Sequence, residues 1–193
     1  MSCAATVALA QSGKAAVAKG GISLGIAVRG AGTTALITSD PAGLKCTKKG
    51  KLMMRCEGTF PAGPVTLTAI PPAGSMFMSY TGGGCNRSDS TCTVSLTSNT
   101  SMTASFGLPS VAVHVDGGGF GRVTSRPEGI YCTRSGGGSC AKEFPRGTSV
   151  TLTAVPDTKV RLTRWEGACS GDAPTCTVIA GKARIIIATF NPP

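Results

Sequence analysis

The sequence is poor in the residues that catalysis and base stacking require. Among 193 residues there is one histidine and there are nine acidic side chains, and aromatic residues make up only 5%. The acids are scattered singly in turn-like contexts, so no two of them form a motif that would place a general acid and a general base across a substrate. We therefore expect a protein that is not an enzyme and that needs no cofactor.

Two other features could suggest chemistry. A cysteine nucleophile needs a nearby base, and the only histidine is His114, which lies between valines in VAVHV. We expect it to be an ordinary strand residue, facing solvent or a satisfied neighbour, and not the partner of Cys3. The glycine-rich run 117–121 lacks the GKS or GKT ending of a phosphate loop, so we predict a hairpin turn there.

Long apolar runs and an export signal are also missing. No window of 18 uninterrupted apolar residues exists, so we expect no membrane span. The first 20 residues lack the basic segment and the long apolar core of a secretory signal, although Ala8, Leu9 and Ala10 are similar to a cleavage site. An upstream signal, or release of virus particles by lysis, would reconcile this with an extracellular protein.

Glycine and proline, in contrast, are abundant. The chain has 27 Gly and 12 Pro, with 41% apolar and 15% charged residues. This composition is typical of many short strands joined by turns and not of a helical bundle. The length suits two small domains, whose limited cores need staples.

The second half of the chain repeats the first. In the first copy ITSDPAGLKC ends at Cys46, and in the second VTSRPEGIYC ends at Cys132. Further along, TFPAGPVTLTAIP of the first copy corresponds to EFPRGTSVTLTAVP of the second. Both copies close with the same spacing, from Cys92 to Phe106 and from Cys176 to Phe190. We predict an N-terminal extended arm (1–24) and two tandem modules (25–108 and 109–193).

Within each module the apolar residues have period two. Val150, Leu152 and Ala154 alternate with the β-branched residues Thr151, Thr153 and Val155 between Gly147 and Pro156, as is typical of a half-buried strand. The first copy repeats the pattern at 65–69. The more continuously apolar 183–190 predicts an interior strand with 111–115 as its companion. No sustained helical stripe exists, so we predict an all-β protein.

The order of these motifs resembles the divergent internalin-B B-repeat. The elements SxPxGIxC, FPxGTSVTLTAVP, W-x-G-x-C and a closing ATF carry the resemblance, which covers most of the chain and is more specific in the second copy. Tyr80 replaces the tryptophan that the second copy keeps as Trp165. The resemblance implies small β-grasp-like or sandwich-like modules, a place in bacterial surface or secreted proteins, and a spacer or adhesive role without catalytic residues.

Nine cysteines without any CxxC favour a disulfide framework in an oxidising compartment. Each module has four, which admit three pairings, and the pairs closest in sequence lie across glycine-rich segments. We therefore predict local disulfides, since the spacings do not suit zinc. The predicted pairs are Cys46 with Cys56, Cys85 with Cys92, Cys132 with Cys140, and Cys169 with Cys176. The remaining Cys3 would form an intermolecular disulfide or stay a free thiol.

The net charge of +10 is the other candidate functional feature. It predicts anionic glycan or acidic protein partners, with solubility alone as the alternative. Nucleic acid is not expected, because few aromatic residues remain for stacking. The basic contact patch would comprise Lys45, Lys48, Lys49, Lys51 and Arg55 in the first module and Lys159, Arg161 and Arg164 in the second.

Together these features predict a non-catalytic structural or binding protein displayed on an extracellular assembly. We predict a phage virion decoration, collar or tail component, because this fits the missing export signal. The alternative is a secreted or surface-anchored bacterial adhesin or filament subunit, which fits the resemblance. The arm (1–24) matches neither repeat and is too short to form a stable isolated hairpin. We expect it to dock on a neighbouring subunit of the same assembly, where Cys3 could cross-link chains.

Overall fold

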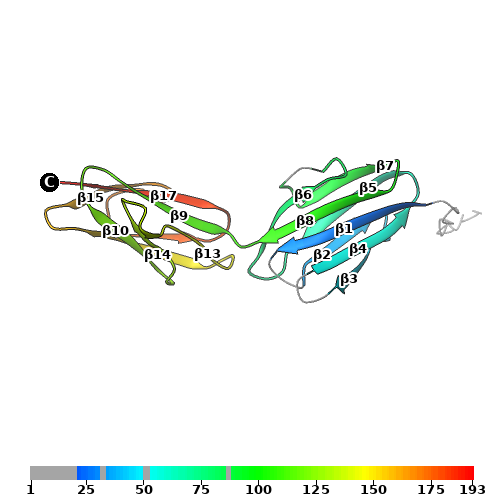
Figure 1. The fold of residues 1–193 in the computed structure, drawn as a ribbon, viewed down its shortest axis with the longest axis horizontal. Helices are drawn as coiled ribbons and strands as arrows, with labels where there is room; N and C mark the ends of the chain where they lie inside the picture. Colours follow the sequence, from blue (N-terminus) through cyan, green and yellow to red (C-terminus); the bar gives the residue numbers. More distant parts are fainter. Residues whose placement is uncertain (1–20, 31–33, 50–52, 86–87) are drawn as a thin grey trace, which may run out of the picture.

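The computed structural model describes residues 21–30, 34–49, 53–85 and 88–193. These residues form seventeen strands, and none of them forms a helix, so the all-β prediction is confirmed. The strands build two modules that follow one another along the long axis of the molecule (Figure 1). Since the described part of the chain has no helix, it contains none that could cross a membrane.

Module 1 consists of two sheets. A five-stranded sheet has the order β3-β4-β1-β8-β6 and a three-stranded sheet has the order β2-β5-β7. The strands are β1 (Ile22–Gly30), β2 (Leu36–Asp40), β3 (Lys45–Lys49), β4 (Met53–Phe60), β5 (Gly63–Ile70), β6 (Met76–Thr81), β7 (Thr91–Leu96) and β8 (Thr100–Gly107). Because β1 begins at Ile22, residues 22–24 of the predicted arm belong to this sheet.

Module 2 also consists of two sheets, but β11, the counterpart of β3, pairs with β10 and so belongs to the other sheet. Its sheets have the orders β13-β9-β17-β15 and β12-β11-β10-β14-β16. The strands are β9 (Ser110–Asp116), β10 (Gly121–Arg126), β11 (Tyr131–Thr133), β12 (Gly138–Ser139), β13 (Ala141–Glu143), β14 (Ser149–Pro156), β15 (Arg161–Gly167), β16 (Thr175–Ile179) and β17 (Arg184–Asn191). In both modules the first and last strands pair in parallel, β1 with β8 and β9 with β17.

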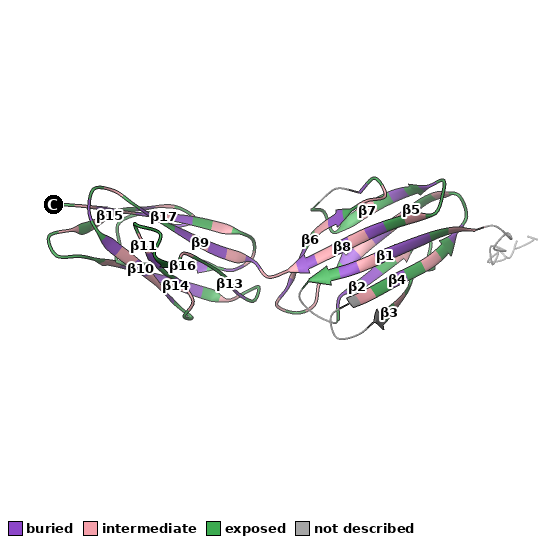
Figure 2. Cartoon of the chain, in the orientation of Figure 1, coloured by how far each residue is buried: buried purple, intermediate pink, exposed green. Residues whose placement is uncertain are grey.

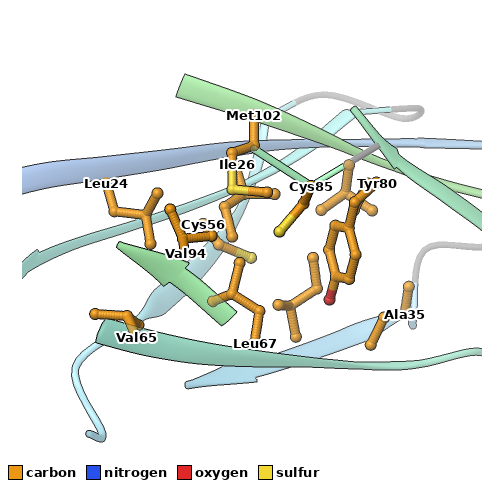
Figure 3. Packing of buried hydrophobic residues seen from close by; sticks show 14 of the residues in the cluster. Leu24, Ile26, Ala35, Cys56, Val65, Leu67, Tyr80, Cys85, Val94 and Met102 are labelled. Carbon is orange, nitrogen blue, oxygen red and sulfur yellow. The ribbon is translucent and has the colours of Figure 1, made fainter. Parts of the chain in front are cut away.

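Each module packs its two sheets around a separate apolar core. In module 1, Leu24 and Ile26 of β1 are fully buried against Val65 and Leu67 of β5 (Figure 3). Along β5 the buried residues alternate with more exposed ones, as the sequence pattern predicts (Figure 2). The modules are thus sandwiches rather than β-grasp units, because a second sheet covers the first and no described helix does so.

A glycine at the end of the first strand is required in both copies. Gly30 has φ of 100° and Gly117 has φ of 102°, in the region that residues with a Cβ rarely adopt. A Cβ at either position would overlap the carbonyl oxygen of the last strand's phenylalanine, Phe106 or Phe190. These glycines therefore allow the first and last strands to approach closely at this end.

The prediction of a hairpin at 117–121 is wrong. The segment leaves β9 in one sheet and enters β10 in the other, so it crosses between the sheets. Its amides bond to neighbouring groups: Gly117 N donates to Asp116 Oδ1, Gly118 N to Asn191 Oδ1 and Gly119 N to Phe190 O. The glycines suit either kind of turn, and only long-range strand pairing distinguishes them.

A short and partly buried linker joins the modules. Only Leu108 and Pro109 lie between β8 and β9; Pro109 is buried, and its carbonyl accepts a hydrogen bond from Phe144 N. A backbone hydrogen bond also joins the two modules, since Arg146 N donates to Gly74 O over 2.6 Å.

The separate cores predict that the single tryptophan reports on module 2 alone. Phe190→Ala should lower the stability measured by Trp165 fluorescence in denaturant by about 3–5 kcal/mol, because it leaves a cavity in a fully packed core. Phe106→Ala, the matched change in module 1, should leave this midpoint unchanged. Equal shifts from both variants would show instead that the modules unfold as one cooperative unit.

Candidate functional site

Four disulfides join cysteines within the modules. Cys46 is bonded to Cys56, Cys85 to Cys92, Cys132 to Cys140, and Cys169 to Cys176, which is the local pairing expected from the sequence. In each pair one sulfur-bearing residue is buried, namely Cys56, Cys85, Cys132 or Cys169, and its partner is more exposed. Each disulfide therefore ties a surface segment to the core.

The predicted basic patch divides between the modules. Lys45, Lys48 and Lys49 belong to β3 and Arg55 to β4, whereas Lys51 lies outside the described residues, as does Cys3. In module 2, Lys159 lies in the turn before β15, and Arg161 and Arg164 lie on β15. Figure 1 shows β3 and β15 in different modules, so the two groups form separate surfaces.

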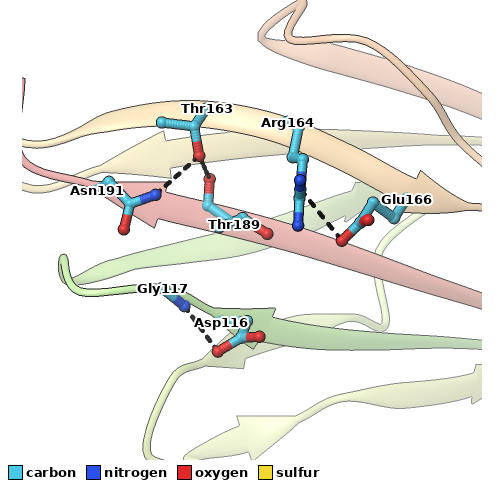
Figure 4. Close-up of polar contacts among 7 residues, drawn as sticks. All are labelled: Asp116, Gly117, Thr163, Arg164, Glu166, Thr189 and Asn191. Atoms are coloured by element: carbon cyan, nitrogen blue, oxygen red, sulfur yellow. Dashed lines mark hydrogen bonds and ion pairs between the residues drawn. The ribbon is translucent and has the colours of Figure 1, made fainter.

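Two of these arginines already have acidic partners. Arg55 forms an ion pair with Glu57, and Arg164 Nε lies 3.3 Å from Glu166 Oε2 (Figure 4). Both pairs are exposed, so they contribute little to stability, but they reduce the charge that these arginines offer to a partner.

The polar groups at the end of β17 hold the strand in place. Asn191 Nδ2 donates to Thr163 Oγ1 over 3.1 Å, and Thr163 Oγ1 donates to the carbonyl of Thr189 over 2.9 Å (Figure 4). Thr163 is the bulged residue of β15, since the register with β17 shifts between Leu162 and Arg164. These hydrogen bonds join β15 to β17, so the polar groups of Thr163 and Asn191 have a structural role.

The described side chains form no candidate metal site. Within the described ranges no three His, Cys, Asp or Glu residues could hold a metal ion together. His114 is exposed on β9, the side of the strand that the alternating pattern assigns to solvent.

A surface of module 2 that the sequence analysis did not identify has two hollows beside an exposed tyrosine. We call it the Tyr131 face, and it is the outer side of β10, β11 and β14. Val123 and Ser125 of β10 point into the core, whereas Arg122, Thr124 and Arg126 point outward. The residues of the Tyr131 face are Arg122, Thr124, Arg126, Tyr131 and Thr153.

Strand register fixes the arrangement of the Tyr131 face. Thr124 lies opposite Tyr131 on one side and opposite Thr153 on the other. A hollow of about 490 Å³ borders Tyr131 on the side of Arg126 and Glu128. A second hollow, of about 280 Å³, borders it on the side of Arg122, Arg134 and Asp157.

The corresponding face of module 1 has a different chemistry. On the outer side of its three-stranded sheet, Leu36 lies opposite Ile70, and Thr38 lies opposite Thr68. Leu36 and Ile70 are exposed, and Asp40 stands where module 2 has Arg126. The strands β2 and β5 thus correspond to β10 and β14, but their outer side chains differ, and β3, the counterpart of β11, pairs with β4 in the other sheet.

The two copies also differ at one buried aromatic position. Trp165 is 2% exposed, and its Nε1 donates to Ala173 O over 2.8 Å. Tyr80, its counterpart, is 1% exposed, and its hydroxyl has no hydrogen-bond partner among the described residues. Burial without a partner disfavours the phenolate and raises the pKa of Tyr80 to about 12.

The solved structures that are similar to this chain are only distantly so. No curated protein sequence matches the chain. The major pilin protein (T-13) of Streptococcus pyogenes serotype GAS131465 is 11% identical over 90% of this chain and 98% of its own, with a TM-score of 0.30. The Bacillus anthracis TIE protein is 13% identical over 89% of this chain and 34% of its own, with a TM-score of 0.35.

The family model that matches is the divergent InlB B-repeat domain. It matches twice, over residues 44–108 and 111–193, which together are more than half of the chain. The chain therefore belongs to this family, and the predicted tandem repeat is confirmed.

The buried hydroxyl of Tyr80 predicts a specific pH dependence. The folded pKa of about 12 exceeds the ordinary value of 10.0, so the unfolded state loses this proton first. Stability should therefore fall as pH rises from about 10 to about 12, and Tyr80→Phe should remove this part of the fall while leaving stability at pH 7 equal or higher. Denaturant titrations of module 1, followed by circular dichroism, measure it. Tyr131→Phe is the matched control, and an equal effect from this exposed tyrosine would contradict the prediction.

The disulfides should contribute a large share of each module's free energy of unfolding. Cys132→Ala with Cys140→Ala removes a bridge of sequence separation 8 and should lower the stability reported by Trp165 by about 2–3 kcal/mol. Removing Cys46 and Cys56 in module 1 should leave that signal unchanged. Mass spectrometry of a nonreduced digest checks the four pairs, and any peptide linking the two modules would refute them.

Proposed function

We propose that this chain is a non-catalytic structural protein that works outside the cell. It would form part of a surface assembly and present binding surfaces at a distance from that assembly. The observation that carries the proposal is the succession of two sandwiches, each tied by two disulfides and joined by a two-residue linker. Disulfides persist in oxidising compartments, where they add to the stability that the limited core of a small module provides.

The setting we favour is the surface of a bacterial cell, with the chain as an adhesin or filament subunit. Membership of the divergent InlB B-repeat family supports it, because such repeats occur in tandem in bacterial surface and secreted proteins. A phage virion decoration, collar or tail component is the alternative setting, and it would use the same stapled modules.

The proposed partner is a neighbouring subunit, contacted through the N-terminal arm. Residues 22–24 belong to β1, so the part available for docking precedes them. The sequence of this part is rich in Ala and Val and includes the ninth cysteine, Cys3, which would link subunits. Edge strands such as β2 and β7 of module 1 offer unpaired backbone groups that a segment of this kind could extend.

Antibodies against the folded chain should label intact cells of the source organism without permeabilisation. The label should remain with the cell wall in a density gradient; label that moves with phage particles would select the alternative setting. Label that requires permeabilisation would contradict the extracellular proposal.

Deletion of residues 2–20 should leave both modules folded, as shown by Trp165 fluorescence and circular dichroism, but should reduce the label on the assembly. Cys3→Ser is the matched control for the cross-link, because it should remove a dimer on nonreducing gels and leave the arm in place. Unchanged incorporation of the deletion variant would refute the role of the arm.

A further inference from the structure

The Tyr131 face combines an exposed aromatic ring with arginines that lack acidic partners. Tyr131 is 50% exposed on β11, beside Thr124 of β10 and between Arg122 and Arg126 along that strand. The described ion pairs involve Arg55 and Arg164, and none involves Arg122, Arg126 or Arg134. These three guanidinium groups are therefore available to an anionic ligand.

The acidic side chains near this face do not neutralise it. Glu128 lines the larger hollow and Asp157 lines the smaller one, so three arginines stand against two carboxylates. Neither carboxylate forms an ion pair in the described part of the chain. Arg134 lies over the ring of exposed Phe120, with 6.0 Å from its central carbon to the ring centroid, which places a cation beside the smaller hollow.

Spacing along β10 sets the size of the ligand. Arg122 and Arg126 are four residues apart on one strand, which at about 3.4 Å per residue separates their Cα atoms by roughly 14 Å. Tyr131 lies on the neighbouring strand, opposite Thr124, midway between them. A ligand that reaches both arginines therefore runs along β10 over Thr124 and beside Tyr131, and it carries negative charges on separate units.

We propose that the Tyr131 face of module 2 binds an acidic oligosaccharide, with one sugar ring lying on Tyr131 and carboxylate or sulfate groups of the flanking sugars bound by Arg122 and Arg126. Guanidinium groups bind such oxyanions through two parallel hydrogen bonds. The apolar face of a sugar ring suits the flat ring of a tyrosine, and the hydroxyls of Thr124 and Thr153 match its polar edge. This inference rests on the proposed extracellular function.

Other anionic polymers fit this face less well. An extended acidic peptide would bind by adding a strand, but the backbone of β11 is already paired with β10 and β12. Single-stranded nucleic acid uses a succession of stacking rings, whereas one face of Phe120 is occupied by Arg134, which leaves Tyr131 as the stacking ring of this surface.

Calorimetric titration of the full chain tests the proposal with hexasaccharides of hyaluronan, heparin and polygalacturonate, and with a neutral chitin hexasaccharide. At least one acidic oligosaccharide should bind, and the neutral one should not. Tyr131→Ala and Arg126→Ala should each weaken binding about tenfold or more, as expected when a charge-assisted bond or a stacking contact is lost. Tyr131→Phe, which keeps the ring, should retain binding, and Trp165 fluorescence should show that all variants are folded.

Arg161→Ala is the charge-matched control, because Arg161 is exposed on β15 in the other sheet of the same module. It should change the affinity less than Arg126→Ala does. Equal losses would show diffuse attraction by net charge and overturn the site. Absence of binding to every acidic oligosaccharide, or tighter Tyr131-dependent binding of poly-glutamate or oligothymidylate, would overturn the ligand class. Neither result would alter the surface labelling that tests the extracellular function.

Discussion

The parallel pairing of the first and last strands of each module places the two modules end to end. Because β1 runs parallel to β8, and β9 to β17, the chain enters each module at one end and leaves it at the other. Antiparallel terminal strands would return the chain to its starting end and fold the second module back beside the first. With Leu108 and Pro109 as the only connection, the parallel arrangement places the modules in series (Figure 1).

This pairing depends on features that both copies share. The positive-φ glycines, Gly30 and Gly117, let the terminal strands approach at their ends, and the buried phenylalanines of the last strand fill the core beneath them. The disulfides act at the surface and not between the terminal strands. They fix surface segments that the small cores cannot hold by burial alone. Strand pairing thus places the modules end to end, and the disulfides hold the surface segments of each module against its core.

Much of the fold could be predicted from the sequence, because local patterns decide it. Period two marked β5 and β14, and the continuous apolar run marked β17 as an interior strand. The crossing at 117–121 could not be predicted, because a glycine-rich turn has the same sequence whether it joins paired strands or separate sheets. The Tyr131 face was missed for a similar reason: Tyr131 and Arg126 lie on different strands, and only the register that places Thr124 between them reveals their proximity.

The comparison of the two outer faces separates scaffold from function. The two faces carry different side chains at equivalent places, since Asp40 corresponds to Arg126 and Leu36 to Arg122. The threonine pairs that support these faces are retained, Thr66 with Thr93 and Thr151 with Thr177, at 2.9 and 3.0 Å between hydroxyl oxygens. The strand pairs that these threonines join, β5 with β7 and β14 with β16, are therefore held constant. The outer chemistry changes from apolar and acidic to aromatic and basic, and β11, which carries Tyr131, joins this sheet in module 2 alone. Such a division suits a protein whose repeats share one architecture and meet different partners.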